Sequence, residues 1–311
     1  MSEILFRQTS FPSADGKTSI AAYFWWPQDV QPRGIIQLSH GMCEYVQRYE
    51  AWARRFAEAG FVFCGNDHLG HGHSAKDAAH LGYTARRGGA ELLVEDLHQM
   101  TQLAKKEFPG LPVVLYGHSM GSFAARLYLP RYGKELAGAL ISGTAGPGQP
   151  VGLGKKVAHL VGALRGDMHR SKMLTGMAFG GYNKKFKQEK HPKSWLTRDE
   201  NARDAYVGDP LCGFTFTVAG YDTLFTLLGA VSDKSWAPSV PRELPILLFA
   251  GDMDPVGDYG KGVRKVYDRL REAGCNVRLK LYEGGRHEMH NEMNKGEVFF
   301  DLVSYLEEIL Q

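Results

Sequence analysis

Short apolar runs alternate with longer segments of helical spacing along most of the chain. An apolar run bounded by Gly, Pro or polar residues predicts a buried strand, and apolar residues three or four positions apart predict a helix. The predicted strands are residues 20–26, 34–38, 61–64, 112–116, 136–141, 246–250 and 277–281. The predicted helices are residues 49–59, 89–108, 122–128, 262–273 and 296–310. This alternation indicates the α/β class, with a mostly parallel sheet flanked by helices on both faces.

The alternation stops between residues 146 and 238, where no apolar run is typical of a strand. Gly and Pro residues open this stretch at 146–150, and apolar residues gather within it at 157–164 and 214–228. An insertion at this point of an α/β chain is expected above the carboxyl ends of the strands, where ligands bind. We therefore predict an α/β core made of residues 1–145 and 239–311, with a helical cap of residues 146–238 inserted between them.

The charge balance excludes some classes of function. The chain has 311 residues, with 37 basic and 34 acidic side chains and a net charge of +3. A nucleic-acid binder would concentrate basic residues on one face, so we expect no nucleic-acid partner. The basic run at 184–193 is expected to be a solvated face. It leaves open a transient contact of the cap with an anionic membrane surface, and nothing in the composition specifies an oligomeric state.

The cysteines and the N-terminal residues bear on the compartment. The four cysteines, Cys43, Cys64, Cys212 and Cys275, form no C-x-x-C pair and match no zinc spacing. They are expected to be buried free thiols in a reducing compartment. The first residues show no signal-peptide pattern, and no apolar run is long enough to span a bilayer. These features predict a cytoplasmic protein.

Residues 117–121 read Gly-His-Ser-Met-Gly, a G-x-S-x-G motif between a predicted strand and a predicted helix. A sharp strand-to-helix turn of this kind lifts a serine hydroxyl clear of the sheet, the arrangement of a nucleophile elbow. Gly117 and Gly121 are expected there because side chains at these positions would collide with the neighbouring strand and helix. The N-terminus of the helix directs free N–H groups to the place where negative charge would develop. Ser119 is therefore the candidate nucleophile.

A serine nucleophile needs a base to accept its proton and a third group to orient that base. His287 lies on a Gly-rich loop after the last predicted strand, and His290 is a rival three residues further on. We favour His287 because the motif places the base on this loop, whereas His290 lies further into the next segment.

The orienting acid is expected after the preceding strand, where two carboxylates follow a glycine. We favour Asp254 as the hydrogen-bond partner of the His287 imidazole. Asp252 is expected to be a turn former that accepts hydrogen bonds from backbone N–H groups, and Asp258 is a more distant candidate. The chain order Ser119, Asp254, His287 is the order expected for a serine on such an elbow.

Stabilising a tetrahedral oxyanion requires two preorganised N–H groups. One is expected to be the backbone N–H of Met120, directly after the candidate nucleophile. The other is expected on the loop after an early strand, where the N–H of Met42 is our choice. Gly41 lets that loop approach a substrate closely, and Glu44 is expected to order it.

Residues 67–74 are rich in histidine and suggest a metal site at first sight. The histidines alternate with glycines, and no carboxylate or cysteine cluster flanks them at ligand spacing. We favour a turn whose polar side chains bind backbone groups. Ser74 lacks the second glycine of an elbow. No metal and no organic cofactor are predicted.

The motifs together resemble a known family. Segments 40–44, 67–74, 117–121, 251–254 and 284–288 are similar to the monoacylglycerol lipase and lysophospholipase branch of the α/β-hydrolases, which is also grouped under the serine aminopeptidase name. The resemblance covers nearly the whole chain. It is strong in the core and weaker in the cap, although 195–199 and 209–213 look like cap segments of bacterial members.

The resemblance implies an α/β-hydrolase fold and the same site residues. It implies Ser119, Asp254 and His287 as the catalytic triad, with the N–H groups of Met42 and Met120 as the oxyanion hole. The chain departs from the family pattern at Tyr45, where eukaryotic members tend to carry His after the glutamate. This departure leaves the fine substrate preference open.

We therefore hypothesise a serine hydrolase that cleaves a carboxylic ester, a monoacylglycerol or a lysophospholipid, through an acyl-enzyme on Ser119. An aminopeptidase or amidase of the same fold is the alternative, and it would need acidic cap residues to hold a substrate amine. A binding protein without catalysis is a third reading, against which the complete triad argues. The expected partner is a small ester or lipid substrate.

Overall fold

Within residues 3–311, which the computed structural model describes, eight strands form one sheet. The strands are β1 (Ile4–Pro12), β2 (Ser19–Pro27), β3 (Ile35–Ser39), β4 (Val62–Asn66), β5 (Val113–His118), β6 (Gly138–Ser142), β7 (Ile246–Gly251) and β8 (Val277–Tyr282). Their order across the sheet is β1-β2-β4-β3-β5-β6-β7-β8. Strand β2 is antiparallel to both of its neighbours, and every pair from β4 to β8 is parallel. The predicted mostly parallel sheet is confirmed.

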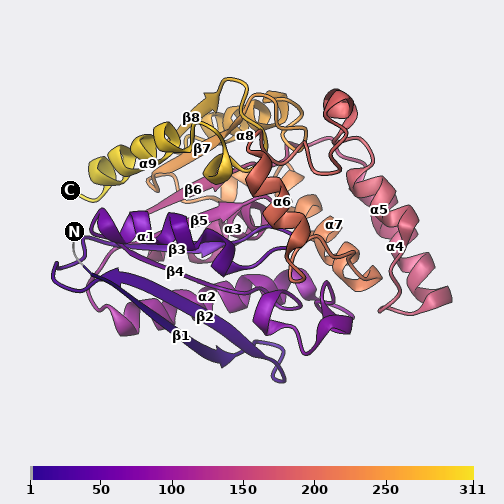
Figure 1. Cartoon of the computed structure of the whole chain (residues 1–311), viewed down its shortest axis with the longest axis horizontal. Coiled ribbons are helices and arrows are strands. Elements are labelled where there is room, and N and C mark those ends of the chain that lie inside the picture. Colours follow the sequence, from indigo (N-terminus) through magenta and orange to yellow (C-terminus); the bar gives the residue numbers. More distant parts are fainter. Residues whose placement is uncertain (1–2) are drawn as a thin grey trace.

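Helices cover both faces of this sheet (Figure 1). They are α1 (Glu50–Glu58), α2 (Gly89–Glu107), α3 (Met120–Tyr132), α8 (Lys261–Glu272) and α9 (Lys295–Ile309). Trp52, Phe56 and Leu302 of α1 and α9 belong to one buried apolar cluster. Leu97 of α2 and Val266 of α8 belong to a second buried apolar cluster, which also includes residues of α3. Alternate side chains of the buried strands enter one cluster or the other, so the sheet separates two cores.

Strand β1 is absent from the sequence prediction. Only Phe11 of its nine residues is buried, and its other side chains are exposed or half-buried. The strand lies at the edge of the sheet and pairs with β2 alone. An edge strand that buries so little carries too few apolar positions to be recognised from periodicity.

The segment between β6 and β7 contains helices and no strand among its described residues. Its elements are α4 (Val151–Arg165), α5 (Lys172–Phe179), the 3-10 helix η5 (Lys184–Glu189), α6 (Glu200–Gly208), α7 (Val218–Ser232) and the 3-10 helix η6 (Ala237–Ser239). We call this segment the insertion. Figure 1 shows its helices gathered at the end of the sheet opposite both chain termini. Phe225, Leu227 and Val231 of α7 join the same apolar cluster as α2 and α3, so α7 packs directly on the core. No helix among residues 3–311 is both long enough and apolar enough to cross a membrane.

Candidate active site

Ser119 lies in a strained turn between β5 and α3. Its backbone has φ 53° and ψ −122°, a conformation that costs a non-glycine residue energy unless its surroundings enforce it. The Ser119 N–H donates to the Ser142 carbonyl oxygen of β6 at 3.0 Å. The Ser119 carbonyl oxygen accepts from the Ser122 N–H at 2.9 Å and from the Ser122 hydroxyl at 2.5 Å. These bonds hold the turn and expose the Ser119 hydroxyl at the end of the sheet.

Two glycines make this turn sterically feasible. A Cβ atom at Gly117 would lie 2.6 Å from the Ala125 Cβ of α3. A Cβ atom at Gly121 would lie 2.0 Å from the Ser39 carbonyl oxygen and 2.3 Å from that of His40. Helix α3 therefore packs against the backbone that follows β3 at a distance that only glycine allows at position 121.

The structure brings Ser119 together with both favoured partners. The Nε2 atom of His287 lies 2.8 Å from the Ser119 Oγ, and its Nδ1 atom lies 2.9 Å from Asp254 Oδ2. Asp254 is fully buried and His287 nearly so. The other carboxylate oxygen of Asp254 accepts the Val256 N–H at 2.8 Å, which fixes the orientation of the carboxylate. Hydroxyl, imidazole and carboxylate thus form one hydrogen-bonded chain.

The loops that carry Asp254 and His287 are in backbone contact. A Cβ atom at Gly251, the last residue of β7, would lie 1.9 Å from the Gly285 carbonyl oxygen. The Met253 N–H donates to that same oxygen at 2.9 Å. Because the two loops are in direct contact, the carboxylate of one reaches the imidazole of the other.

The environment of His287 favours its charged form. Burial alone would lower the pKa of the imidazole, but the charge and hydrogen bond of Asp254 raise it above its ordinary value. An imidazole with such a partner is a stronger base than a free one.

The loop after β3 supplies a free N–H beside Ser119. The Gly41 N–H donates to Glu44 Oε1 at 2.5 Å, and the same oxygen accepts the Tyr49 hydroxyl at 2.9 Å, so Glu44 holds the loop. A Cβ atom at Gly41 would lie 3.1 Å from the Ser119 Cβ. Among residues 3–311 no acceptor pairs with the next N–H, that of Met42. The Met120 N–H, at the first position of α3, has no carbonyl within the helix to bind.

The rival residues lie in other environments. The His290 ring stacks on Tyr49 with 4.3 Å between ring centroids, and neither of its nitrogens has a partner among the described residues. Burial lowers the pKa of His290 to about 3. Asp252 accepts the Gly284 N–H at 2.8 Å, as expected of a turn former. Asp258 is exposed.

Residues 67–74 form a hydrogen-bonded turn. Asp67 accepts the Val46 N–H at 2.9 Å and the His73 N–H at 2.8 Å, and the Ser74 hydroxyl donates to the Asp67 carbonyl at 2.8 Å. The His68 N–H donates to His40 Nε2 at 2.9 Å. Within residues 3–311 no group of three or more His, Cys, Asp or Glu side chains is arranged to hold a metal ion.

Two cavities meet at Ser119, and residues of the insertion line both. The first, of about 180 Å³, is lined by polar and apolar side chains together, and we call it the polar cavity because it is the more polar of the two. Its polar residues include His287, Glu288, Lys193, Thr175 and Asn183. The second, of about 100 Å³, is lined by apolar side chains. Those side chains include Phe123, Met177, Leu224, Phe225 and Leu228. Met42, Phe179 and Trp195 border both cavities, so they form the junction above the Ser119 hydroxyl.

The chain is similar to known proteins over nearly its whole length. The sequence profile of the serine aminopeptidase family S33 matches residues 30–294. The chain belongs to this family. The monoacylglycerol lipase of Mycolicibacterium smegmatis is 31% identical to it over 287 residues, which is 91% of either chain. The monoglyceride lipase of Homo sapiens is 29% identical over 290 residues, 90% of this chain and 83% of the human one.

A solved structure extends the similarity to three dimensions. A carboxyl esterase from Bacillus coagulans, crystallised in complex with glycerol, superposes with a TM-score of 0.92 and 32% identity. The match covers 98% of this chain and 99% of the esterase. The S33-family chain therefore has the α/β-hydrolase fold that the sequence predicted.

Sequence reasoning expected Glu44 to order its loop but missed the ion pairs that link Glu44 to Glu288 through Arg48 in this S33-family chain. Arg48 donates to Glu44 Oε2 at 2.5 Å and to both carboxylate oxygens of Glu288 at 3.0 Å, and none of the three side chains is more than 9% exposed. Burial would raise the pKa of Glu288, but Arg48 lowers it to about 2. The four-residue spacing of Glu44 and Arg48 was the available signal for this ion pair. The Arg48 side chain thus links the loop after β3 to the loop of His287.

We predict that Gly121→Ala lowers the free energy of unfolding of this protein by at least ~2 kcal/mol. The added Cβ would overlap two backbone carbonyl oxygens, which cannot rotate away as a side chain could. Thermal unfolding measures the change. Gly176→Ala, in α5, is the matched control because a Cβ there meets nothing within 4 Å. A Gly121→Ala melting temperature equal to that of the control would contradict the prediction.

Proposed function

We propose that this chain hydrolyses carboxylic esters through an acyl-enzyme on Ser119, with His287 as the base and Asp254 as the residue that orients it. The observation that carries the proposal is the hydrogen-bonded chain from Ser119 Oγ to His287 at 2.8 Å and from His287 to Asp254 at 2.9 Å. The chain is a carboxylic ester hydrolase of the α/β-hydrolase fold, like its relatives.

The proposed reaction proceeds in two steps. The Ser119 oxygen attacks the ester carbonyl while its proton passes to His287 Nε2, and the N–H groups of Met42 and Met120 bind the resulting oxyanion. Each such donor contributes about 3 kcal/mol. The C–O bond to the alcohol then breaks, and His287 returns the proton to the leaving oxygen. In the second step His287 takes a proton from water, whose oxygen attacks the carbonyl carbon of the acyl-enzyme. The bond between that carbon and Ser119 Oγ then breaks, His287 gives the proton to Ser119 Oγ, and the carboxylic acid leaves.

The two cavities suggest where the substrate lies. His287 must reach the leaving oxygen, and it borders the polar cavity only, so we assign the alcohol to that cavity. The acyl chain then occupies the apolar cavity, which Met120 borders. Because the insertion lines both cavities, we propose that residues 146–238 act as a cap over Ser119, with residues 1–145 and 239–311 as the core.

A monoacylglycerol is the first proposed substrate. It combines one apolar chain with a small polar alcohol, which matches one apolar and one polar cavity at Ser119. The relatives from Mycolicibacterium smegmatis and Homo sapiens carry the names monoacylglycerol lipase and monoglyceride lipase.

A lysophospholipid is the second candidate, and one observation favours it. Lys193 borders the polar cavity, and no carboxylate among residues 3–311 pairs with its ammonium group, which lies 5.2 Å from the centre of the Tyr206 ring. An ammonium group beside the alcohol would attract a phosphate on that alcohol.

The same wall argues against an aminopeptidase. Glu44 and Glu288 border the polar cavity, but Arg48 pairs with both. An aminopeptidase would need an unpaired acidic group to hold the substrate amine, and Lys193 would repel that amine. A panel of esters and amides distinguishes an amidase of the same fold from an ester hydrolase.

We predict that a fluorophosphonate probe labels the wild-type protein and leaves Ser119→Ala unlabelled. Hydrolysis of a monoacylglycerol by Ser119→Ala should fall by at least about 10⁴-fold, because no other group replaces the nucleophile. Mass spectrometry of the labelled peptide and a panel of monoacylglycerols, lysophospholipids, short esters and aminoacyl amides provide the measurements. Absence of wild-type labelling, or labelling of both proteins, would rule out the proposal. Preference for the amides would favour the amidase.

We predict an acid limb in the pH profile of kcat/KM for a neutral ester. Protonated His287 cannot accept the Ser119 proton, so activity must fall as the pH drops through the pKa of His287. Asp254 raises that pKa, so the midpoint should lie above about 6.5, the ordinary value for histidine. A profile that stays flat to pH 5 would exclude His287 as the base.

We predict that Lys193→Met lowers the preference for 1-acylglycerol-3-phosphate over the monoacylglycerol of the same chain length by about 10-fold, the effect of losing ~1.4 kcal/mol of a charge-assisted contact. The ratio of the two kcat/KM values is the measurement. Lys187→Met is the control because Lys187 is exposed and does not border the cavity. Equal ratios in wild type and Lys193→Met would leave the monoacylglycerol as the single candidate.

A further inference from the structure

The residues on either side of His287 carry opposite charges, and each is paired with a different part of the molecule. Glu288 pairs with Arg48, next to α1. Arg286 pairs with Glu189, at the end of η5 in the insertion. The loop that carries His287 is therefore held from the core on one side and from the insertion on the other.

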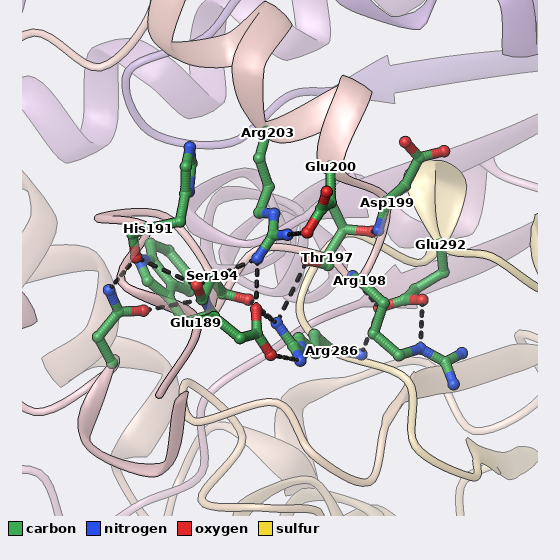
Figure 2. A network of polar contacts seen from close by, with 12 residues as sticks. Glu189, His191, Ser194, Thr197, Arg198, Asp199, Glu200, Arg203, Arg286 and Glu292 are labelled. Atoms are coloured by element: carbon green, nitrogen blue, oxygen red, sulfur yellow. Dashed lines mark hydrogen bonds and ion pairs between the residues drawn. The ribbon is translucent and has the colours of Figure 1, made fainter. Parts of the chain in front are cut away.

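The guanidinium of Arg286 is enclosed by the insertion. It donates through two nitrogens to the two carboxylate oxygens of Glu189, one of them at 2.9 Å, as Figure 2 shows. It also donates to the Ser194 carbonyl oxygen at 2.5 Å and lies 4.1 Å from the centre of the Phe186 ring. Only 10% of the Arg286 side chain is exposed. A buried charge of this kind depends on its counter-charge.

The backbone of the same loop is bound to the insertion as well. The His287 N–H donates to the Trp195 carbonyl oxygen at 3.4 Å, and the Glu288 N–H donates to that of Leu196 at 2.7 Å. The Arg286 N–H donates at 3.0 Å to Glu292, which also accepts from Arg198 of the insertion. Hydrogen bonds to the insertion therefore help to fix the position of the loop that carries His287.

The Glu189 carboxylate binds a second guanidinium beside that of Arg286. Arg203 of α6 donates to Glu189 Oε2, and to the hydroxyl of Ser194 at 3.1 Å (Figure 2). Hydrogen bonds from Arg286 lower the pKa of Glu189 to about 2, so the carboxylate is charged throughout the neutral range. Without this charge, Arg203 retains Glu200, whereas Arg286 retains only uncharged partners among the described residues, namely two carbonyl oxygens and the Phe186 ring.

We propose that Glu189 is a positioning residue for His287: by holding Arg286, it keeps the imidazole in line between Ser119 and Asp254. The inference rests on the proposed function, and it adds that the insertion takes part in catalysis besides lining the cavities. Loss of the carboxylate charge releases the Arg286 side chain toward water and displaces the adjacent His287. A displacement of about 1 Å lowers the rate of the chemical step by about 100-fold.

The test compares Glu189→Gln with Glu200→Gln and Glu189→Asp. Glu200 is 84% exposed and pairs with Arg203 but not with Arg286, so its variant is the matched control. The substrate is a soluble short-chain p-nitrophenyl ester, and thermal unfolding measures the folded fraction of each protein. For Glu189→Gln we expect kcat to fall 10- to 100-fold, KM to stay within about threefold, and fluorophosphonate labelling to slow in parallel with kcat. Glu200→Gln should keep the wild-type kcat, and Glu189→Asp, which keeps the charge, should recover part of it.

Three results would overturn the inference. The first is a Glu189→Gln protein that is folded and retains the wild-type kcat. The second is a rise in KM with kcat unchanged, which would mean that Glu189 affects only binding. The third is an equal loss of kcat in Glu200→Gln, which would indicate a general effect on α6. If Glu189→Gln does not fold, a folded Arg286→Gln protein that retains the wild-type kcat overturns it, because Arg286 is the side chain through which Glu189 is proposed to act. Wild-type protein that neither hydrolyses esters nor reacts at Ser119 would instead reject the proposed function, and this inference with it.

Discussion

One hydrogen bond, from the Ser119 hydroxyl to His287, joins parts of the chain that are 168 residues apart. It depends on the sheet, in which β5, β6, β7 and β8 are consecutive neighbours. Their carboxyl ends meet at one edge, where Ser119, Asp254 and His287 follow β5, β7 and β8. The backbone contact between Gly251 and Gly285 brings the last two loops within reach of each other. Without close packing at that point, the carboxylate would not reach the imidazole.

Ion pairs around His287 connect its loop to other parts of the molecule. Arg48 joins Glu44 of the loop after β3 to Glu288, and Glu189 joins the insertion to Arg286. Buried ion pairs contribute little net stability compared with apolar packing, but they restrict geometry because each charge must face its partner. The site therefore uses apolar packing to bring its loops together and ion pairs to fix their orientation.

Much of the fold and the site could be predicted from the sequence, because their signals are local. The runs of β3 to β7 are buried throughout, and β8 alternates apolar with charged residues. The G-x-S-x-G motif indicates the turn in which Ser119 lies. Strand β1 could not be predicted, since it buries only Phe11. The pairing of Arg286 with Glu189 could not be predicted either, because 97 residues separate them and no periodicity sets the path of the insertion. The path of the insertion also determines which of its residues line the two cavities at Ser119, so these cavities could not be predicted either.

Because β5 precedes β7 and β8 in the chain, Ser119 is synthesised before Asp254 and His287. A polypeptide is synthesised from its N-terminus, so β5, Ser119 and the insertion leave the ribosome before β7 and β8. Until β7 pairs with β6 and β8 pairs with β7, Ser119 has neither His287 nor Asp254, and its hydroxyl is an ordinary alcohol. The newly made chain therefore contains its proposed nucleophile in an inert form. Chemical competence arrives only when the last strand of the sheet is in place.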